Sequence, residues 1–529
     1  MSQIARKSLL FSSLLVAVLV MVTAGTALWA ARPGKVAATS TSGTCPPPPT
    51  TTNPFPAPPA PVLSRVIPTV IPPHPASQSP LQSRAFFDTF SWQSFIALNW
   101  PAAIDSATQL PIRGLADPSS GVSIGSPGTR VWETYKADWE TFRGGAVPTP
   151  WPSYDVSGPA GPCSGSTKNA ASGAGRVLTM PTKMDDVVQG FNEAFAGPLI
   201  AQYPAGTPAQ SQYARYEIRL NQSQYTQILQ NGWYLTKNLP VAPNVVNFDS
   251  TPTAAGSPGS PYGAIEIKAA WKEIVNQAEA PSYYTITASV VEPGTPATCR
   301  QNVLLGLVGL HIAHKITPFR EWVWSTFEHI ANVPDPHYPN IKSYSFNNGT
   351  NDPPPNPKGY DYEPPIASSA QPLPGGKPVQ VNRVTPIPAT PQFATQSIND
   401  AFQGILPAPW NNYQLVATQW PTVTDAAQFV PSGSYPYNCD CPFPNDPVAN
   451  AVAETYFQSA SPGINSCMHC HYLTAATDFS WTLAKGSYPQ PGGARAAAAT
   501  GREARNLVRL QQLRTALRAA TERRNSKKP

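Results

Sequence analysis

Prolines occur along this chain at more than twice the usual frequency, and they limit its fold more than any other feature. The 529 residues include 64 prolines, about 12% where about 5% is typical. Because proline removes a backbone N–H group and breaks helices, a helical bundle or a coiled coil is excluded. Hydrophobic residues make up 41% of the chain and aromatic residues 10%, which suffices for a packed core. We therefore expect a loop-rich α+β protein with mixed strands and helices.

The N-terminus has the pattern of an export signal. Arg6 and Lys7 precede Leu9–Ala31, which is 23 residues without a charge. A basic segment followed by an apolar one is typical of secretory signals. The small side chain of Ala27 permits cleavage, and the uncleaved stretch is long enough to span a bilayer. We expect residues 1–31 to be a signal peptide or a signal anchor, and the remaining chain to be periplasmic, either soluble or anchored.

Changes in composition divide the rest of the chain into five segments. Proline-rich segments are extended and partly stiff, and they bury little surface. The expected segments are a proline-rich tether (32–83), an α+β body (84–352), a proline-rich linker or long loop (353–395), a region that carries a cysteine motif (396–490) and a basic tail (491–529).

Alternation of apolar and polar residues predicts strands in the body. The β-branched and glycine content of 263–330 also favours strands over helices. A helix is predicted in QSQYTQILQNGW, directly after the first strand, and 449–460 has helical character. The predicted strands are 213–221, 263–271, 283–291, 302–316 and 322–330.

The net charge of +6 comes from the C-terminal end of the chain. Residues 494–529 contain ten Lys and Arg against two Asp and Glu, a net +8, so the rest carries about −2. The body therefore lacks the basic charge that nucleic-acid binding requires, and no nucleic-acid partner is expected. Residues 502–524 combine leucines at helical spacing with arginines. This pattern suits docking on anionic lipid, on an acidic redox partner or on the chain's own body.

The segment SCMHCHYL carries the most specific motif of the sequence. Cys467, Cys470 and His471 form C-x-x-C-H, the attachment sequence of c-type haem. Two thiols three residues apart can each form a thioether with one vinyl group of the same porphyrin. The next residue, His471, can then coordinate the iron from the proximal side. Because bacteria attach haem covalently outside the cytoplasm, the motif agrees with the export signal, and we expect one covalent haem c.

Two other interpretations use the same cysteines. Four thiolates from Cys439, Cys441, Cys467 and Cys470 would make a structural zinc site, but the spacing is unusual and His471 has no part in it. A plain disulfide suits an oxidising compartment. Haem attachment accounts for all three residues of the motif and is the favoured interpretation.

The chain resembles bacterial c-type cytochromes, and among them a large, poorly characterised mono-haem group. The resemblance rests on Cys467, Cys470 and His471, and on the segments FSWQSFIALNWP, LVGLHIAHKI and WVWSTFEHI. It implies thioethers at both cysteines, an axial ligand at His471 and electron transfer in the periplasm. The sequence departs from compact cytochromes, which supply an axial methionine after the motif, because residues 472–529 contain neither Met nor His.

The second axial ligand must therefore come from upstream of the motif, or the sixth position is open. His311 and His314 lie among apolar residues, and Met180 and Met184 flank the predicted helix start TKMDDVVQGFNEAF. The other upstream histidines are His74, His329 and His337. The distal candidates are His311, His314, Met180 and Met184.

His311 and His314, with Glu328 and His329, also invite a separate metal site. On a helix, residues three apart share a face, whereas on a strand they point to opposite faces. Because 302–316 is predicted to be a strand, we do not expect one metal ion to take both histidines.

Four further cysteines follow the tether, which itself contains Cys45. Cys439 and Cys441 are too close in sequence to pair with each other without strain. We therefore expect them to form two disulfides by pairing with Cys163 and Cys299, which an oxidising compartment permits.

Electron transfer to a redox partner of unknown identity is the function that these residues favour. The rival is a haem-dependent oxidoreductase, peroxidase- or oxygenase-like, with an open distal site, because the chain is several times larger than an electron carrier needs. A third class is ligand sensing or scaffolding by the large body outside the haem region. We find no Ser/His/Asp arrangement, P-loop or dinucleotide motif in the sequence that indicates another cofactor.

Overall fold

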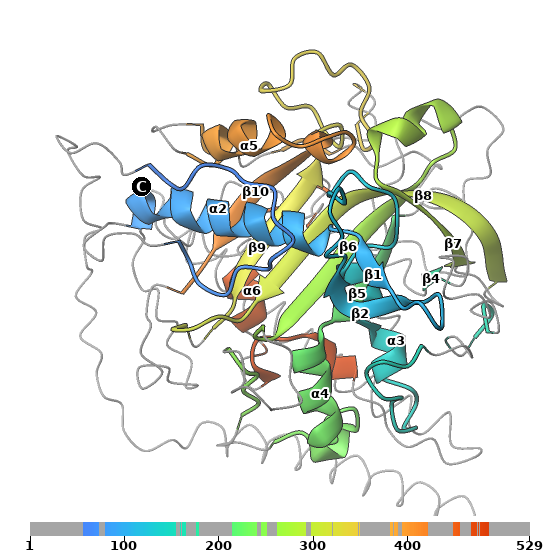
Figure 1. Ribbon diagram of the computed structural model, residues 1–529. Helices are drawn as coiled ribbons and strands as arrows, with labels where there is room; N and C mark the ends of the chain where they lie inside the picture. Colours follow the sequence, from blue (N-terminus) through green and yellow to red (C-terminus); the bar gives the residue numbers. More distant parts are fainter. Residues whose placement is uncertain are drawn as a thin grey trace, which may run out of the picture. The chain divides into compact units, whose positions relative to one another are not determined.

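Eight strands form one sheet in the part of the chain that the computed structural model describes (Figure 1). The main path runs β10–β9–β8–β6–β5–β3, while β7 pairs with β8 and β4 with β7. All pairs are antiparallel except β4 with β7. The strands are β3 (Lys136–Ala137), β4 (Val177–Leu178), β5 (Arg215–Leu220), β6 (Ile265–Glu273), β7 (Thr285–Glu292), β8 (Thr298–His314), β9 (Val323–His329) and β10 (Tyr413–Gln419).

Helices and a small second sheet, β1 (Ala102–Ile104) with β2 (Pro111–Ala116), surround the main sheet. The α-helices are α2 (Pro80–Leu98), α3 (Asp138–Thr141), α4 (Gln222–Gln230), α5 (Thr395–Gln403) and α6 (Cys467–Tyr472). The short 3-10 helices are η1 (Trp132–Thr134), η4 (Thr236–Asn238), η5 (Gln277–Ser282), η6 (Trp410–Asn412) and η10 (Thr482–Lys485). The expectation of an α+β fold is confirmed.

The described residues are 57–72, 80–154, 159, 161–164, 176–178, 214–240, 245–250, 262–292, 298–319, 321–347, 349, 381–383, 386–389, 394–421, 448–454, 467–472, 474 and 477–485. Outside them lie the expected signal (1–31), most of the linker (353–395), the tail (491–529), and Cys45, His74, Met180, Met184, Cys439 and Cys441. Among the described helices, none combines the length and apolar character needed to cross a membrane.

The five predicted strands are confirmed as β5, β6, β7, β8 and β9. The helix predicted after the first of them is α4. Asn221 caps this helix, because its side chain accepts a hydrogen bond from Gln224 N at 3.1 Å and so satisfies one of the unpaired N–H groups of the first turn.

The prediction of helical character at 449–460 is wrong for 449–454, which are not helical and include a turn at 451–453. The rest of that segment lies outside the described residues. Asn450 explains the difference. Its side-chain oxygen accepts hydrogen bonds from Val452 N at 2.9 Å and Ala453 N at 3.1 Å. Such local bonds offer the backbone an alternative to a helix.

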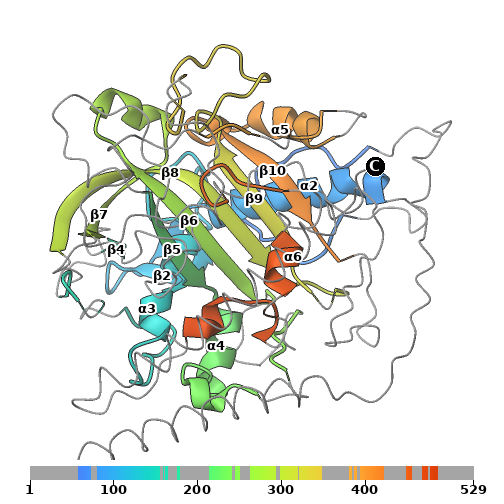
Figure 2. The same cartoon turned by 180° about the vertical axis from the view of Figure 1, so that it is seen from behind.

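Strand β8 is buried on both faces of the sheet, which explains its apolar run. Leu310 and Ile312 pack in a cluster with α2 and α5, whereas Ala313 packs in a second cluster on the other face. Figure 1 shows α2 crossing the sheet on the near side, and Figure 2, from behind, shows α6 on the opposite side. The sheet therefore separates the α2 face from the face that carries α6.

One disulfide prediction is wrong. Cys163 and Cys299 are bonded to each other, with Cα atoms 5.1 Å apart and 136 residues between them in sequence, so neither is left for Cys439 or Cys441. The strand pairing accounts for this, because Cys299 lies opposite Val291 of β7 and β7 also pairs with β4. These pairings bring Cys163, which precedes β4 in the sequence, close to Cys299 at the start of β8. The spacing of the cysteines in the sequence does not reveal this proximity.

Candidate functional site

The C-x-x-C-H motif folds as the short helix α6. Positions 467 and 470 are about one turn apart on it, since helical residues three apart share a face. Met468 anchors the helix, because its side chain is 2% exposed and packs in the same cluster as Trp324. Met468 N also donates to Gln419 Oε1 of β10 at 3.2 Å. The sheet therefore holds the motif through Met468, which occupies a position where C-x-x-C-H allows any residue.

His471 is oriented by a backbone carbonyl. Its Nδ1 lies 2.6 Å from Phe479 O, and because a carbonyl only accepts, Nδ1 carries the proton. The lone pair of the neutral ring is then on Nε2. The imidazole also lies against the indole of Trp324, with ring centroids 4.0 Å apart. Metal-binding histidines are usually fixed by such a bond from their other nitrogen, so Nε2 is prepared as a ligand atom.

The carbonyl that holds His471 belongs to a turn with uncommon backbone angles. Asp478 and Phe479 have φ values of 54° and 63°, in the left-handed region, where a residue other than glycine costs about 1–3 kcal/mol. Backbone hydrogen bonds join Phe479 N to Thr474 O at 3.0 Å and Thr474 N to His471 O at 2.9 Å. These bonds close the turn onto the end of α6.

Three other segments contact this turn, which we call the 478–479 turn. Lys315 Nζ forms an ion pair with Asp478 Oδ2, and the two side chains are 1% and 0% exposed. Phe248 N donates to the same carboxylate oxygen at 2.7 Å. Trp322 Nε1 donates to the backbone oxygen of Asp478 at 2.8 Å. The turn is therefore fixed by a buried charge pair and by two further donors.

Strand β8 places the two histidine candidates for the second ligand on opposite faces of the sheet. His311 shares a face with Ala313, whose register partner is Trp324, the residue that contacts His471. Diagonal positions of this kind are about 7–8 Å apart. His311 Nε2 also lies 3.5 Å from Glu454 Oε2. The structure therefore brings His311 to the face that carries α6.

His314 and His337 lie instead on the side of α2 and α5. The His314 ring stacks on Phe90 with centroids 5.5 Å apart and is 1% exposed. Burial lowers the pKa of His314 to about 3. His337 Nε2 lies 2.7 Å from Asp400 of α5. The sheet separates His314 from His471, so the two are not brought together.

The residues considered for a separate metal site are engaged in other contacts. His329 Nε2 donates to Ser282 O at 2.8 Å, while Nδ1 accepts from Ala331 N at 3.1 Å. Burial lowers the pKa of His329 to about 3. Glu328 forms an ion pair with Arg383 at 2.5 Å. Within the described ranges, no three His, Cys, Asp or Glu side chains form a group that could hold a metal ion.

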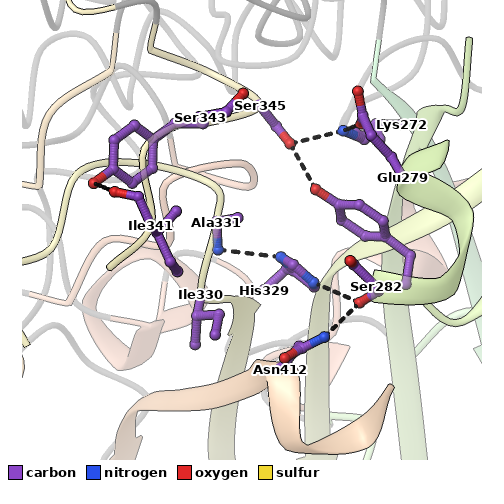
Figure 3. A pocket seen from close by; sticks show the side chains of 12 residues that line it. Lys272, Glu279, Ser282, His329, Ile330, Ala331, Ile341, Ser343, Ser345 and Asn412 are labelled. Atoms are coloured by element: carbon purple, nitrogen blue, oxygen red, sulfur yellow. Dashed lines mark hydrogen bonds and ion pairs between the residues drawn. The ribbon is translucent and has the colours of Figure 1, made fainter. Parts of the chain in front are cut away.

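A pocket of about 270 Å³ lies at the far end of β9 from Trp324 and is lined in part by His329 (Figure 3). In it, Lys272 Nζ donates to Ser345 Oγ at 3.0 Å, and the hydroxyl of Tyr283 lies 3.1 Å from the same oxygen. A serine beside a lysine is also a nucleophile arrangement of some hydrolases. Here, however, Lys272 forms an ion pair with Glu279 at 2.6 Å, so it donates to the serine instead of taking its proton.

Sequence reasoning missed the 478–479 turn and its partner Lys315. The turn acts through a backbone carbonyl, which any residue supplies, so residue types give no signal for it. Trp324 belongs to WVWSTFEHI, a segment that carried the resemblance, but its contact with His471 depends on how α6 docks on the sheet. Only the tertiary structure shows that the 478–479 turn, Lys315 and Trp324 contribute to the surroundings of His471.

The described residues thus supply an imidazole of fixed tautomer at the end of an anchored C-x-x-C-H helix, with a second histidine on the same face of the sheet. Comparison with known proteins adds no further guide, since no protein-family model, curated protein or solved structure matches the chain.

Proposed function

We propose that this chain is an exported mono-haem c-type cytochrome that transfers electrons outside the cytoplasm. In this proposal Cys467 and Cys470 hold the porphyrin through thioethers, and His471 Nε2 is the proximal iron ligand. The observation that carries the proposal is the 2.6 Å contact between His471 Nδ1 and Phe479 O. It fixes the tautomer that an iron ligand needs, and it raises the basicity of the imidazole.

The surroundings of the motif also suit a haem. Met468, Phe479 and Leu483 are 2%, 1% and 0% exposed and pack in one apolar cluster with Trp324. Bound haem iron would supply one-electron chemistry. The chain's own part is to fix the ligands, to exclude water and to set the reduction potential through burial and hydrogen bonding.

His311 is the second axial ligand that the described residues support best. It lies on the same face as Trp324 and His471, whereas His314 faces α2. Its Nε2 lies 3.5 Å from Glu454 Oε2, and a carboxylate beside the ring is a usual neighbour of metal-bound histidines. This assignment predicts a low-spin iron with two histidine ligands.

The pair of His311 and Glu454 also favours a second candidate function. If the iron keeps an open sixth position, a histidine beside a carboxylate is suited to proton transfer on the distal side. The protein would then be a haem-dependent oxidoreductase of the peroxidase or oxygenase type. The two candidates share the attachment site and differ in what His311 does.

The absorption spectrum separates these candidates. The full-length protein is made in a host with haem-attachment machinery and recorded oxidised, reduced, and reduced under CO. If the protein is an electron carrier, we expect the wild type to give a low-spin c-type spectrum that does not change under CO. The variant His311→Ala should then become CO-sensitive, while the matched control His314→Ala should not. A wild-type spectrum that shifts with CO favours the oxidoreductase and contradicts ligation by His311.

The compartment is part of the same proposal. Residues 1–31 direct the chain to the periplasm as a cleaved signal or as an anchor. Because covalent attachment takes place outside the cytoplasm, a variant that lacks residues 1–31 should accumulate without covalent haem in a host that matures the full-length chain. Covalent haem on the truncated variant would contradict export by this segment.

A further inference from the structure

More buried contacts hold the 478–479 turn than a turn after a helix needs in order to form. We propose that the buried ion pair of Lys315 and Asp478 positions the carbonyl of Phe479 against His471, and thereby sets how strongly this imidazole donates to the haem iron. The inference rests on the proposed function, since it concerns the same proximal histidine. Lys315 and Asp478 are positioning residues in this account, because they act on His471 only through the carbonyl.

The contacts hold both sides of the peptide unit that joins Asp478 to Phe479. On one side, Trp322 Nε1 donates to Asp478 O at 2.8 Å. On the other, Phe479 N donates to Thr474 O at 3.0 Å, and the Phe479 side chain is 1% exposed in the core. With this peptide plane and the phenyl ring fixed, the direction of the next carbonyl, Phe479 O, is restricted. That carbonyl points at His471 Nδ1.

The energetics favour a positioning role over a purely stabilising one. Removing two charges from water costs several kcal/mol per ion, and replacing a buried ion pair by apolar residues is often neutral or stabilising. Here the pair is almost fully buried. Hydrogen bonds from Lys315 Nζ to Asn247 Oδ1 at 2.8 Å and from Phe248 N to Asp478 Oδ2 at 2.7 Å offset part of that cost. What the pair adds over apolar residues is a fixed geometry.

The backbone angles support the same conclusion. Two successive residues in the left-handed region, one of them a phenylalanine, are both energetically unfavourable, and such angles persist only where the surroundings impose them. They cluster at functional sites, where strain pre-organises a group. In this turn the group is the Phe479 carbonyl, and the surroundings that impose the angles include Lys315 and Trp322.

The chemical consequence is a lower reduction potential. A well-aligned bond from Nδ1–H to a carbonyl makes the imidazole a stronger donor, and a stronger donor stabilises the ferric iron. Loss of alignment should therefore raise the potential. This readout distinguishes positioning from stability, because a variant that only weakens the fold leaves the potential of the folded protein unchanged.

The test uses two variants of the full-length holoprotein that do not change its net charge. Trp322→Phe keeps an aromatic ring at a buried position and removes the indole donor to Asp478 O. The double variant Lys315→Met with Asp478→Asn removes both charges. The matched control is Trp233→Phe, since Trp233 packs on Phe248 in the same cluster. Potentials are measured by spectroelectrochemistry, and unfolding by denaturant.

We expect both test variants to keep covalent haem and to show a higher reduction potential than wild type, while Trp233→Phe loses stability without a shift in potential. If the double variant does not fold, Lys315→Arg, which keeps the charge but changes the geometry of the ion pair, takes its place beside Trp322→Phe. Unchanged potentials in the folded test variants would overturn the positioning role. A wild type without covalent haem would instead overturn the proposed function, so the two failures are distinguishable.

Discussion

His471, His329 and His314 carry the same side chain in three different settings. Nδ1 of His471 bonds to Phe479 O, which leaves the ring's lone pair on Nε2, the atom that we propose as the iron ligand. Both nitrogens of His329 bond to the backbone, so this ring is structural. The two nitrogens of His314 have no hydrogen-bond partner within the described part of the chain. The role of each histidine therefore follows from its neighbours and cannot be inferred from its residue type.

His314 should make the protein sensitive to acid. Its pKa is about 3 in the folded protein and about 6.5 in an unfolded chain. The unfolded state therefore binds the proton first as the pH falls. Below about pH 6.5, and down to about pH 3, this residue should lower the free energy of unfolding by up to about 1.4 kcal/mol per pH unit. Urea unfolding at a series of pH values measures this slope.

The variant His314→Phe keeps an aromatic ring against Phe90 and removes the titrating group. We expect a shallower loss of stability between about pH 6.5 and pH 3 than in wild type. His329→Phe differs, because it loses the hydrogen bonds to Ser282 and Ala331. It should therefore lower the free energy of unfolding already at neutral pH, by about 1–3 kcal/mol. An identical pH slope in wild type and His314→Phe would contradict this account.

At the scale of the elements, α5 and α2 are joined to β10 through one side chain. Asn399 of α5 accepts from Trp92 Nε1 at 2.9 Å and from Leu415 N at 3.0 Å, and donates to Leu415 O at 2.9 Å. Strand β10 ends the path of the main sheet, and an end strand presents unpaired backbone groups. The Asn399 side chain pairs two of them and links both helices to the strand.

Asn399→Ala should therefore be strongly destabilising. It leaves the Trp92 N–H and two backbone groups of Leu415 buried without these bonds, and each such group costs about 1–3 kcal/mol. We expect a loss of roughly 3–5 kcal/mol in the free energy of unfolding, measured with urea.

The control for this loss is Asn231→Ala, which removes an exposed bond to Gln227 O at 2.8 Å and should change stability by less than about 0.5 kcal/mol. Equal effects of the two substitutions would refute the role given to Asn399.

At the scale of the whole molecule, the sequence predicts the parts better than their arrangement. Alternation located β5, β6 and β7, because successive side chains of a strand point to opposite faces of a sheet, while β-branched residues and glycines located β8 and β9. The spacing of Cys467, Cys470 and His471 predicts a haem-attachment site. The same spacing says nothing about which face carries α6. The pairing of Cys163 with Cys299 was missed for the same reason, since it depends on strands distant in sequence.

The Cys163–Cys299 bond should matter for global stability, because it closes a loop across 136 residues. The double variant Cys163→Ser with Cys299→Ser removes it without leaving a lone thiol at this site. We expect the free energy of unfolding to fall by about 2–5 kcal/mol, measured with guanidinium chloride under oxidising conditions. A variant as stable as wild type would show that this link does not constrain the unfolded chain.

The central claim is that haem is bound covalently at Cys467 and Cys470, and the intact mass of the full-length protein tests it most directly. The protein is made in a host with haem-attachment machinery, beside a control cytochrome and the variant Cys467→Ala with Cys470→Ala. We predict that the denatured wild-type chain carries the mass of one haem and that the variant carries none. A wild type of apoprotein mass, where the control cytochrome matures, would contradict the claim.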